Sequence, residues 1–177
     1  MRQEERRART RSALLRSAQS AIAARGYEGA SIDAIATSVG LSKGAVYAHF
    51  PNKLELYLGV VNAALDQADH RVERVAAALR SGQSPLEASR AYFGLAGDGE
   101  HASIIADIWR VAGDEPAVRT ELDRYLERRS MALSHAAVDA GSRPGEALEL
   151  AATVGRLIDA EMLYRRLGEV PALAIGS

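Results

Sequence analysis

The sequence predicts an all-α protein, in which an N-terminal three-helix unit is joined by one long helix to a C-terminal helical bundle. Three observations support this fold class. Apolar residues recur at steps of three and four along the 177 residues, Gly, Pro, Ser and Asn separate the periodic runs, and strand patterns are almost absent. We expect about eight helices.

The first four helices are bounded by residues that start or stop helices. The first is expected over about residues 5–25, the second ends before Gly40, and the third is short. The fourth keeps one apolar stripe from Leu54 to Leu79, which predicts a rigid helix of about seven turns. The residues that mark these starts and stops are Gly26, Ser31, Gly40, Ser42, Pro51 and Asn52.

Four more helices follow. "SPLE" at 84–87 is a strong helix start, and we expect this fifth helix to carry Leu86, Phe93 and Leu95 before ending in residues 97–101. The sixth is expected from near residue 102 to Gly113. The seventh and eighth are expected over about 116–141 and 144–167, each opened by a proline.

The last helix is apolar on two sides, whereas a terminal helix of a small bundle needs one buried stripe. The second stripe predicts a homodimer, and a helix enclosed within its own monomer is the alternative. The predicted interface residues are Leu150, Val154, Leu157 and Ile158.

Charge is distributed unevenly. Residues 1–50 contain eight Arg or Lys and four Asp or Glu, a net charge of +4, and the remaining 127 residues carry −5. The basic end is therefore where a polyanion would bind. A solvated, charged first helix explains the same asymmetry.

Two short capped helices joined by "VGLS", with a stabilising helix before them, form a helix-turn-helix at about residues 31–50. In that motif the second helix enters the major groove of DNA. Gly44 and Ala45 keep this helix slim, and Lys43 is a candidate to contact guanine bases. Tyr47 and His49 are placed to meet phosphates, and Lys53 adds a cation at the start of the long helix.

The stretch "SIDAIATSVGLSKGAVYAHFPNKLELYLGVV" (31–61) resembles the helix-turn-helix of TetR-family transcriptional regulators, and the match covers about residues 8–68. The resemblance implies a dimeric, ligand-responsive DNA-binding protein, most often a repressor, with a regulatory C-terminal core. It implies DNA contacts from Ser31, Ser42, Lys43, Gly44, Ala45, Tyr47, His49 and Lys53. Ala48 departs from the family, which often has a bulkier residue there, so we expect specificity to rest partly on DNA shape.

Aromatic residues of the C-terminal helices either line an apolar ligand cavity or fill an ordinary core. His101 is interpreted as a surface residue at a helix start, with an anchor at a pocket mouth as the alternative. The predicted pocket residues are Leu65, Tyr92, Phe93, Ile105, Trp109 and Tyr125.

Other functions lack support in the sequence. There is no Cys, no metal-ligand spacing among the four His residues, no phosphate-binding glycine loop and no catalytic triad pattern. We expect no enzyme activity, no metal, no cofactor, no signal peptide and no membrane span, and a cytoplasmic location.

These observations predict a DNA-binding domain at 1–52 and a ligand-binding and dimerisation domain at 53–177. The predicted function is a homodimeric transcriptional regulator that acts as a repressor. It binds a palindromic operator of double-stranded DNA, and a small apolar or amphipathic ligand releases it. The alternative is a ligand-independent or protein-regulated DNA-binding regulator whose C-terminal core only dimerises.

Overall fold

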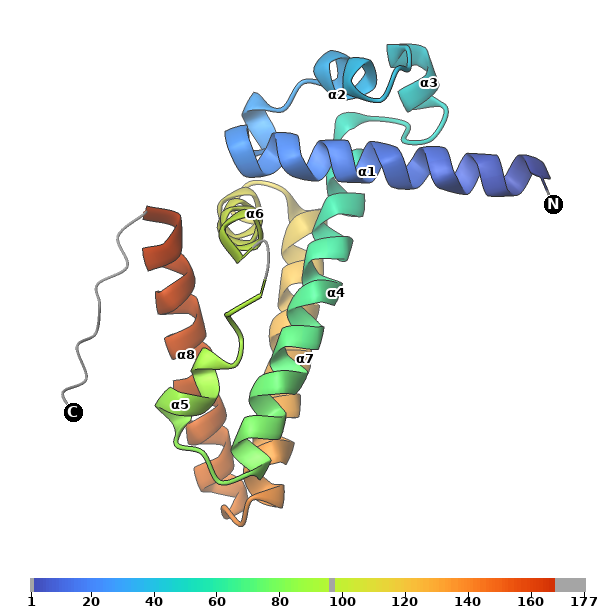
Figure 1. Cartoon of the computed structure of the whole chain (residues 1–177). Helices are drawn as coiled ribbons and strands as arrows, with labels where there is room; N and C mark the ends of the chain where they lie inside the picture. The colour runs from blue at the N-terminus through green and yellow to red at the C-terminus, as the bar shows by residue number, and fades with distance from the viewer. Residues whose placement is uncertain (1, 96–97, 168–177) are drawn as a thin grey trace. The chain divides into compact units, whose positions relative to one another are not determined.

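Helices make up nearly all of the regular structure. The computed structural model describes residues 2–95 and 98–167, and these ranges contain eight helices and no strand (Figure 1). The predicted fold class is confirmed. In chain order the helices are α1 (Arg2–Gly29), α2 (Ile32–Ser38), α3 (Lys43–Tyr47), α4 (Lys53–Arg80), α5 (Pro85–Arg90), α6 (Asp98–Val111), α7 (Pro116–Asp139) and α8 (Pro144–Leu167).

Polar side chains start four of these helices. Ser31, Ser42 and Asn52 each accept a hydrogen bond from the backbone N–H three residues later, at 3.4, 3.2 and 2.8 Å. Ser84 and Glu87 form a complete capping box at the start of α5. Each bond satisfies a backbone donor that has no partner within its own helix. The predicted starts of α2, α3, α4 and α5 are confirmed.

Three helix boundaries differ from the prediction. Gly26 interrupts α1 with φ 71° and ψ 173°, but helical turns resume and continue to Gly29. Helix α6 begins at Asp98, inside the segment predicted as a loop, and α5 ends early, at Arg90. Asp98 accepts hydrogen bonds from the N–H groups of Gly94 and Leu95, at 2.6 and 3.1 Å, which ends the loop there.

The chain folds into two compact units. Unit 1 contains residues 1–65 and 103–122, and unit 2 contains residues 66–102 and 123–177. Helices α4, α6 and α7 each contribute residues to both units. These units divide α4 after Leu65, so the domain boundary at residue 52 remains a prediction.

The core of unit 1 joins α1 to the two short helices. Leu14, Ala18 and Ile22 of α1 are buried, and α2 and α3 lie together on one side of α1 (Figure 1). Val46 and Phe50 are 0% and 2% exposed, so both belong to this core. Their burial fixes which face of α3 is turned outward.

The core of unit 2 encloses one side of α8. Helix α5 packs against α8, and Val154 and Ile158 are each 0% exposed. Arg129 of α7 makes a two-point ion pair with Asp159 of α8, at 2.6 and 3.0 Å. Val154 and Ile158 therefore already have partners in their own chain, as the enclosed-helix alternative requires. Within the described ranges, no helix has the length and apolar character needed to cross a membrane.

Candidate nucleic-acid interface

The turn between α2 and α3 is compact. Gly40 has φ +70°, a left-handed conformation that glycine adopts without strain. The N–H of Leu41 donates to the carbonyl oxygen of Ala36 at 2.9 Å, and Ser42 then caps α3. The turn and the buried Val46 together hold α3 with its opposite face free.

The eight residues predicted to contact DNA are all accessible from outside unit 1. Ser31, Ser42, Lys43, Gly44 and Tyr47 are exposed. Ala45, His49 and Lys53 are partly exposed. We call these eight residues the recognition surface. Their contacts with DNA remain predictions, but none of the eight is enclosed by the protein.

Gly44 belongs to this surface and lies between Lys43 and Ala45 in α3. A β-carbon built on Gly44 would have as its nearest neighbour the Ser42 hydroxyl oxygen, at 3.9 Å, an ordinary contact distance. Its backbone is also helical rather than left-handed. Neither internal packing nor backbone strain therefore requires glycine here, and glycine is unfavourable in a helix.

Lys43 is oriented by a neighbour on α2. Its ammonium group lies 3.0 Å from the carboxylate of Asp33, and the two side chains are 51% and 65% exposed. The hydrogen bond to Asp33 raises the pKa of Lys43, so Lys43 remains a cation. A pair this exposed adds little stability and is easily opened when Lys43 meets another acceptor.

Lys53 is held more firmly than the sequence indicates. Its ammonium group donates to the carbonyl oxygen of Glu28 at 3.1 Å and lies 4.8 Å from the centre of the Tyr27 ring. Both partners come from the short helical segment after Gly26. Lys53 is thus placed at the N-terminus of α4, where an anion is favoured.

A buried carboxylate connects this segment to α4 and α6. Asp107 of α6 is 2% exposed, and it accepts hydrogen bonds from the Tyr27 N–H and the Tyr57 hydroxyl, both at 3.0 Å. Arg110 donates to its other oxygen at 2.8 Å. The Tyr27 and Tyr57 rings lie 4.5 Å apart. We call Tyr27, Tyr57, Asp107 and Arg110 the Asp107 cluster, and it contacts Lys53 through Tyr27.

The Asp107 cluster was not predicted from the sequence. Its one signal in the sequence is that Asp107 falls within the apolar stripe of α6, between Ile104 and Val111 at helical spacing. A carboxylate in such a position is expected to be paired, since an isolated buried charge is costly. Helical spacing does not identify the partner, which is 80 residues away in the sequence at Tyr27.

The predicted pocket residues are not all in one unit. Leu65 and Ile105 are buried in unit 1, and Trp109 of the same unit is 46% exposed. Tyr92, Phe93 and Tyr125 are buried in unit 2. Tyr92 and Phe93 are in edge contact, with ring centres 5.0 Å apart. Unit 2 therefore brings three of the six residues into one core.

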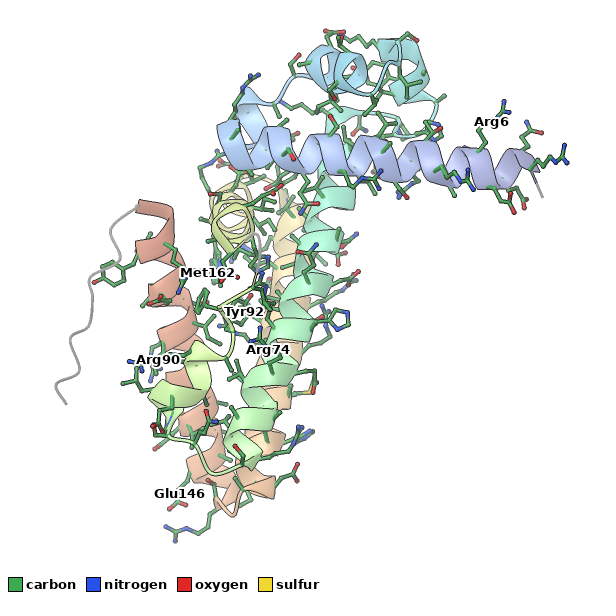
Figure 2. All side chains as sticks on the ribbon, in the orientation of Figure 1. Arg6, Arg74, Arg90, Tyr92, Glu146 and Met162 are labelled. Carbon is green, nitrogen blue, oxygen red and sulfur yellow. The ribbon has the colours of Figure 1, made fainter. Side chains whose placement is uncertain are left out.

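Unit 2 also contains buried polar groups. Arg71 is 5% exposed and donates to the carboxylate of Asp98 at 2.5 Å and to the Tyr92 carbonyl oxygen at 2.9 Å. The Tyr92 hydroxyl lies 3.0 Å from Nε2 of His101. We call Arg71, Tyr92, Asp98 and His101 the unit 2 polar cluster; Figure 2 labels Tyr92 within it.

The interpretation of His101 as a surface residue is wrong, because its side chain is 4% exposed. Burial, with a smaller contribution from the positive charge of Arg71, lowers the pKa of His101 to about 4. The imidazole is therefore neutral at pH 7. The start of α6 at Asp98, three residues earlier, turns His101 into the core rather than outward.

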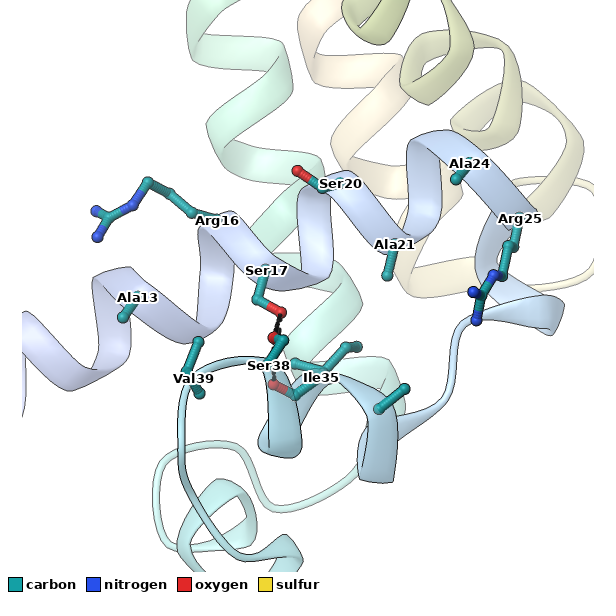
Figure 3. A pocket seen from close by; sticks show the side chains of 11 residues that line it. Ala13, Arg16, Ser17, Ser20, Ala21, Ala24, Arg25, Ile35, Ser38 and Val39 are labelled. Carbon is teal, nitrogen blue, oxygen red and sulfur yellow. Dashed lines mark hydrogen bonds between the residues drawn. The ribbon is translucent and has the colours of Figure 1, made fainter.

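A groove of about 580 Å³ lies between α1 and α2 (Figure 3). Small residues line most of it, and the Ser17 and Ser38 hydroxyls meet across it at 2.5 Å. Arg16 and Arg25 also contribute to its wall. The groove belongs to unit 1 and includes none of the predicted pocket residues.

Three comparisons place this geometry among known proteins. Residues 14–60 match the family model described as "Bacterial regulatory proteins, tetR family". A crystal structure from Mesorhizobium loti MAFF303099, described as a TetR-family transcriptional regulator, superimposes with a TM-score of 0.68 at 21% identity. The alignment covers 92% of this chain and 98% of that one, and it supports the fold.

Two curated relatives share parts of the sequence. The HTH-type transcriptional regulator CymR of Pseudomonas putida is 31% identical over 129 residues, 71% of this chain and 62% of the relative. The HTH-type transcriptional activator FasR of Mycolicibacterium smegmatis is 42% identical over 71 residues, 40% of this chain and 31% of the relative. The chain thus aligns with less than two thirds of either relative.

Proposed function

Because the chain belongs, through residues 14–60, to the tetR family of bacterial regulatory proteins, we propose that it is a DNA-binding transcriptional regulator rather than an enzyme. The observation that carries the proposal is Gly44, a helical glycine of the recognition surface at which an added β-carbon would meet nothing closer than 3.9 Å. A position without a side chain allows α3 to approach the base edges of a major groove closely.

The neighbours of Gly44 suit the same partner. Lys43 presents donors beside it, and Tyr47, 40% exposed, presents a hydroxyl one turn later. Lys53, held by Tyr27 and Glu28, supplies a fixed cation for a phosphate. In this proposal Lys43 and Ala45 read bases, and Tyr47, His49 and Lys53 position the duplex.

The test is DNA binding by two variants that leave the core intact. Gly44→Leu fills the space outside α3, and Tyr47→Ala removes a phosphate contact. We expect Gly44→Leu to reduce affinity for the DNA upstream of the protein's own gene at least about 100-fold, which is about 2.7 kcal/mol. Tyr47→Ala should weaken binding to all DNA sequences about equally. Fluorescence anisotropy with a labelled duplex measures both.

Gly145→Leu is the matched control. Gly145 is also a helical glycine, but it lies in unit 2, and an added β-carbon there would meet nothing within 4 Å. This control should bind as the unchanged protein does. Normal affinity of Gly44→Leu for the upstream DNA would contradict the assignment of α3 as the reading helix.

We further propose a homodimer that binds a palindromic site, with two α3 helices about 34–36 Å apart. Exposed apolar side chains on α7 and α8 offer the contact surface, since Val154 and Ile158 are used within the protomer. Replacing Met131 and Leu163, which are 55% and 56% exposed, by glutamate should yield monomers in light scattering. The exposed apolar residues are Met131, Val138, Leu148, Leu163 and Tyr164.

Control by a small ligand in unit 2 completes the proposal. The Nδ1 atom of His101 is buried and has no hydrogen-bond partner in the described part of the chain, so a polar group of a ligand is one candidate partner. A ligand that changes the spacing of the two α3 helices weakens DNA binding, and DNA weakens the ligand by the same factor. A repressor is the more frequent outcome in the family, whereas FasR is named as an activator.

The ligand-controlled form makes a prediction that the ligand-independent form does not. A low-molecular-mass extract of the producing cells should reduce affinity for the upstream duplex at least about 5-fold, the lower end of ordinary allosteric coupling. An unchanged affinity over a range of extract concentrations would favour the alternative in which unit 2 only dimerises.

A further inference from the structure

Helix α1 extends well beyond the core that it belongs to. It begins at Arg2, but Leu14 is its first buried residue, and all but one of residues 2–12 are exposed. The segment "RQEERRARTRS" contains no large apolar side chain. About three turns of helix therefore project without a packing reason, although isolated short helices are marginal in water.

The charged residues of this projection are arranged along one side. Arg2, Arg6 and Arg9 are spaced by four and three residues, which places them on one face of the helix, and Arg16 continues that face. Over the 14 residues from Arg2 to Arg16 the helix rises about 21 Å. We call these four residues the arginine face. In residues 2–12 five arginines outnumber two glutamates.

These arginines are not used in structural ion pairs. Arg2, Arg6, Arg9 and Arg16 make no salt bridge to any other described residue, unlike Arg71 and Arg129 of unit 2. Figure 2 shows Arg6 near the free end of α1, pointing to the side of the helix on which α2 and α3 lie. The cations are therefore free to meet an external anion.

The projection is also fixed relative to α3. The Arg11 guanidinium lies 4.6 Å from the centre of the Phe50 ring, and Phe50 is buried directly after α3. Leu14 and Ala18 then anchor the same helix in the core of unit 1. A duplex read by α3 thus meets α1 at a defined position.

We propose that the arginine face of α1 binds backbone phosphates of the DNA that flanks the sequence read by α3. This inference rests on the proposed function and adds a second contact region to it. A duplex presents about 12 negative charges over 21 Å of its axis, enough to match the four arginines. A lipid surface fits less well, because residues 2–12 have no apolar face to insert into it.

The test is the salt dependence of binding. Each phosphate contact contributes about 0.9 to the slope of log affinity against log salt. Replacing Arg2, Arg6 and Arg9 together by glutamine should lower the slope by about 3 for each protomer. Affinity at 100 mM salt should fall at least about 10-fold, both for the upstream duplex and for a random duplex of equal length, because phosphate contacts do not depend on sequence.

A matched triple variant removes the same charge elsewhere. Arg90, Arg143 and Arg156 are exposed residues of unit 2, and their replacement by glutamine should leave the slope unchanged. Circular dichroism should show the same helix content and melting temperature for both variants, apart from fraying of the first turns of α1.

The possible results separate the two proposals. An unchanged slope in the α1 variant, or equal losses in both triple variants, overturns the arginine face. An unmodified protein that binds the upstream and random duplexes equally contradicts the proposed function instead. A loss of slope on both duplexes, with the preference for the upstream duplex retained, supports both.

Discussion

Unit 1 contains two polar regions that use charge in opposite ways. The recognition surface exposes Lys43 and Tyr47, and the ion pair of Lys43 with Asp33 is open to solvent. The Asp107 cluster buries its carboxylate to 2% exposure and surrounds it with donors from Tyr27, Tyr57 and Arg110. The first region is available for a partner, and the second is already satisfied by its own chain.

Glycine shows the same difference. Around Gly44 a β-carbon meets nothing closer than 3.9 Å, whereas at Gly26 it would lie 2.9 Å from Oδ1 of Asp107. Gly26 also has φ +71°, which an L-residue rarely adopts. Gly26 is required by the interior of the protein, whereas neither a close contact nor a backbone angle within unit 1 requires Gly44. Substitutions in the two regions should therefore separate stability from DNA binding.

The largest effect is expected from Asp107→Ala. It leaves the buried Tyr57 hydroxyl and Tyr27 N–H without an acceptor, and each unsatisfied group costs about 1–3 kcal/mol. We expect the free energy of unfolding to fall by about 3–4 kcal/mol, measured by urea denaturation. Asp139→Ala breaks an exposed pair with Arg80 and should cost less than about 1 kcal/mol. Similar losses in the two variants would contradict the structural role of Asp107.

Gly26→Ala should have the next largest effect. The left-handed backbone costs an L-residue about 1 kcal/mol or more, and the contact with Asp107 adds to that. We expect the free energy of unfolding to fall by about 2–3 kcal/mol. Gly40→Ala is the control, since φ is +70° there but nothing lies within 4 Å, and it should lose only about 1 kcal/mol. Equal melting temperatures for these two variants would mean that the contact with Asp107 is relieved at no cost.

His101 extends the comparison to unit 2 through pH. Its pKa in the folded protein is about 4, below the ordinary 6.5, so the unfolded chain binds the proton more tightly. The stabilisation is complete above about pH 6.5 and is lost as pH falls toward 4. Between pH 7 and pH 5 the free energy of unfolding should fall by about 2 kcal/mol from this residue. His101→Gln should remove that part of the pH dependence in urea titrations, and an identical dependence would refute the assignment.

Gly44→Ala gives the smallest change in stability, and in the opposite direction. Since alanine is the better helix former and no atom obstructs its methyl group, the protein should gain up to about 1 kcal/mol. Affinity for the upstream duplex should nevertheless decrease, as measured by anisotropy. A variant that is both less stable and weaker in binding would show that Gly44 is needed for folding.

Much of the fold was predictable, because helix ends are determined locally. Ser31, Ser42 and Asn52 bond to backbone groups only three residues away, so the residue types reveal the caps. The accessibility of the recognition surface was predictable for a related reason. Val46 and Phe50 fall on the buried face at helical spacing, which turns Lys43 and Tyr47 outward.

The remaining features depend on residues far apart in the chain. Arg71 and Asp107 each fall within an apolar stripe, so their burial could be predicted from helical spacing. Their partners could not be predicted in this way. Likewise the apolar stripe of α8 did not reveal whether Val154 and Ile158 pack in the same chain or in a partner, because both give the same periodicity.

The number of helices, the starts of α2, α3, α4 and α5, the basic N-terminal segment and the outward face of α3 follow from the sequence alone, since each depends on residues within about one or two helical turns. Contacts between distant residues are responsible for the rest: Tyr27 meets Asp107 across 80 residues, His101 is buried and neutral, and α1 projects beyond its core. Helical periodicity predicts which face of a helix is buried. Which element packs against that face depends on the packing of the whole chain.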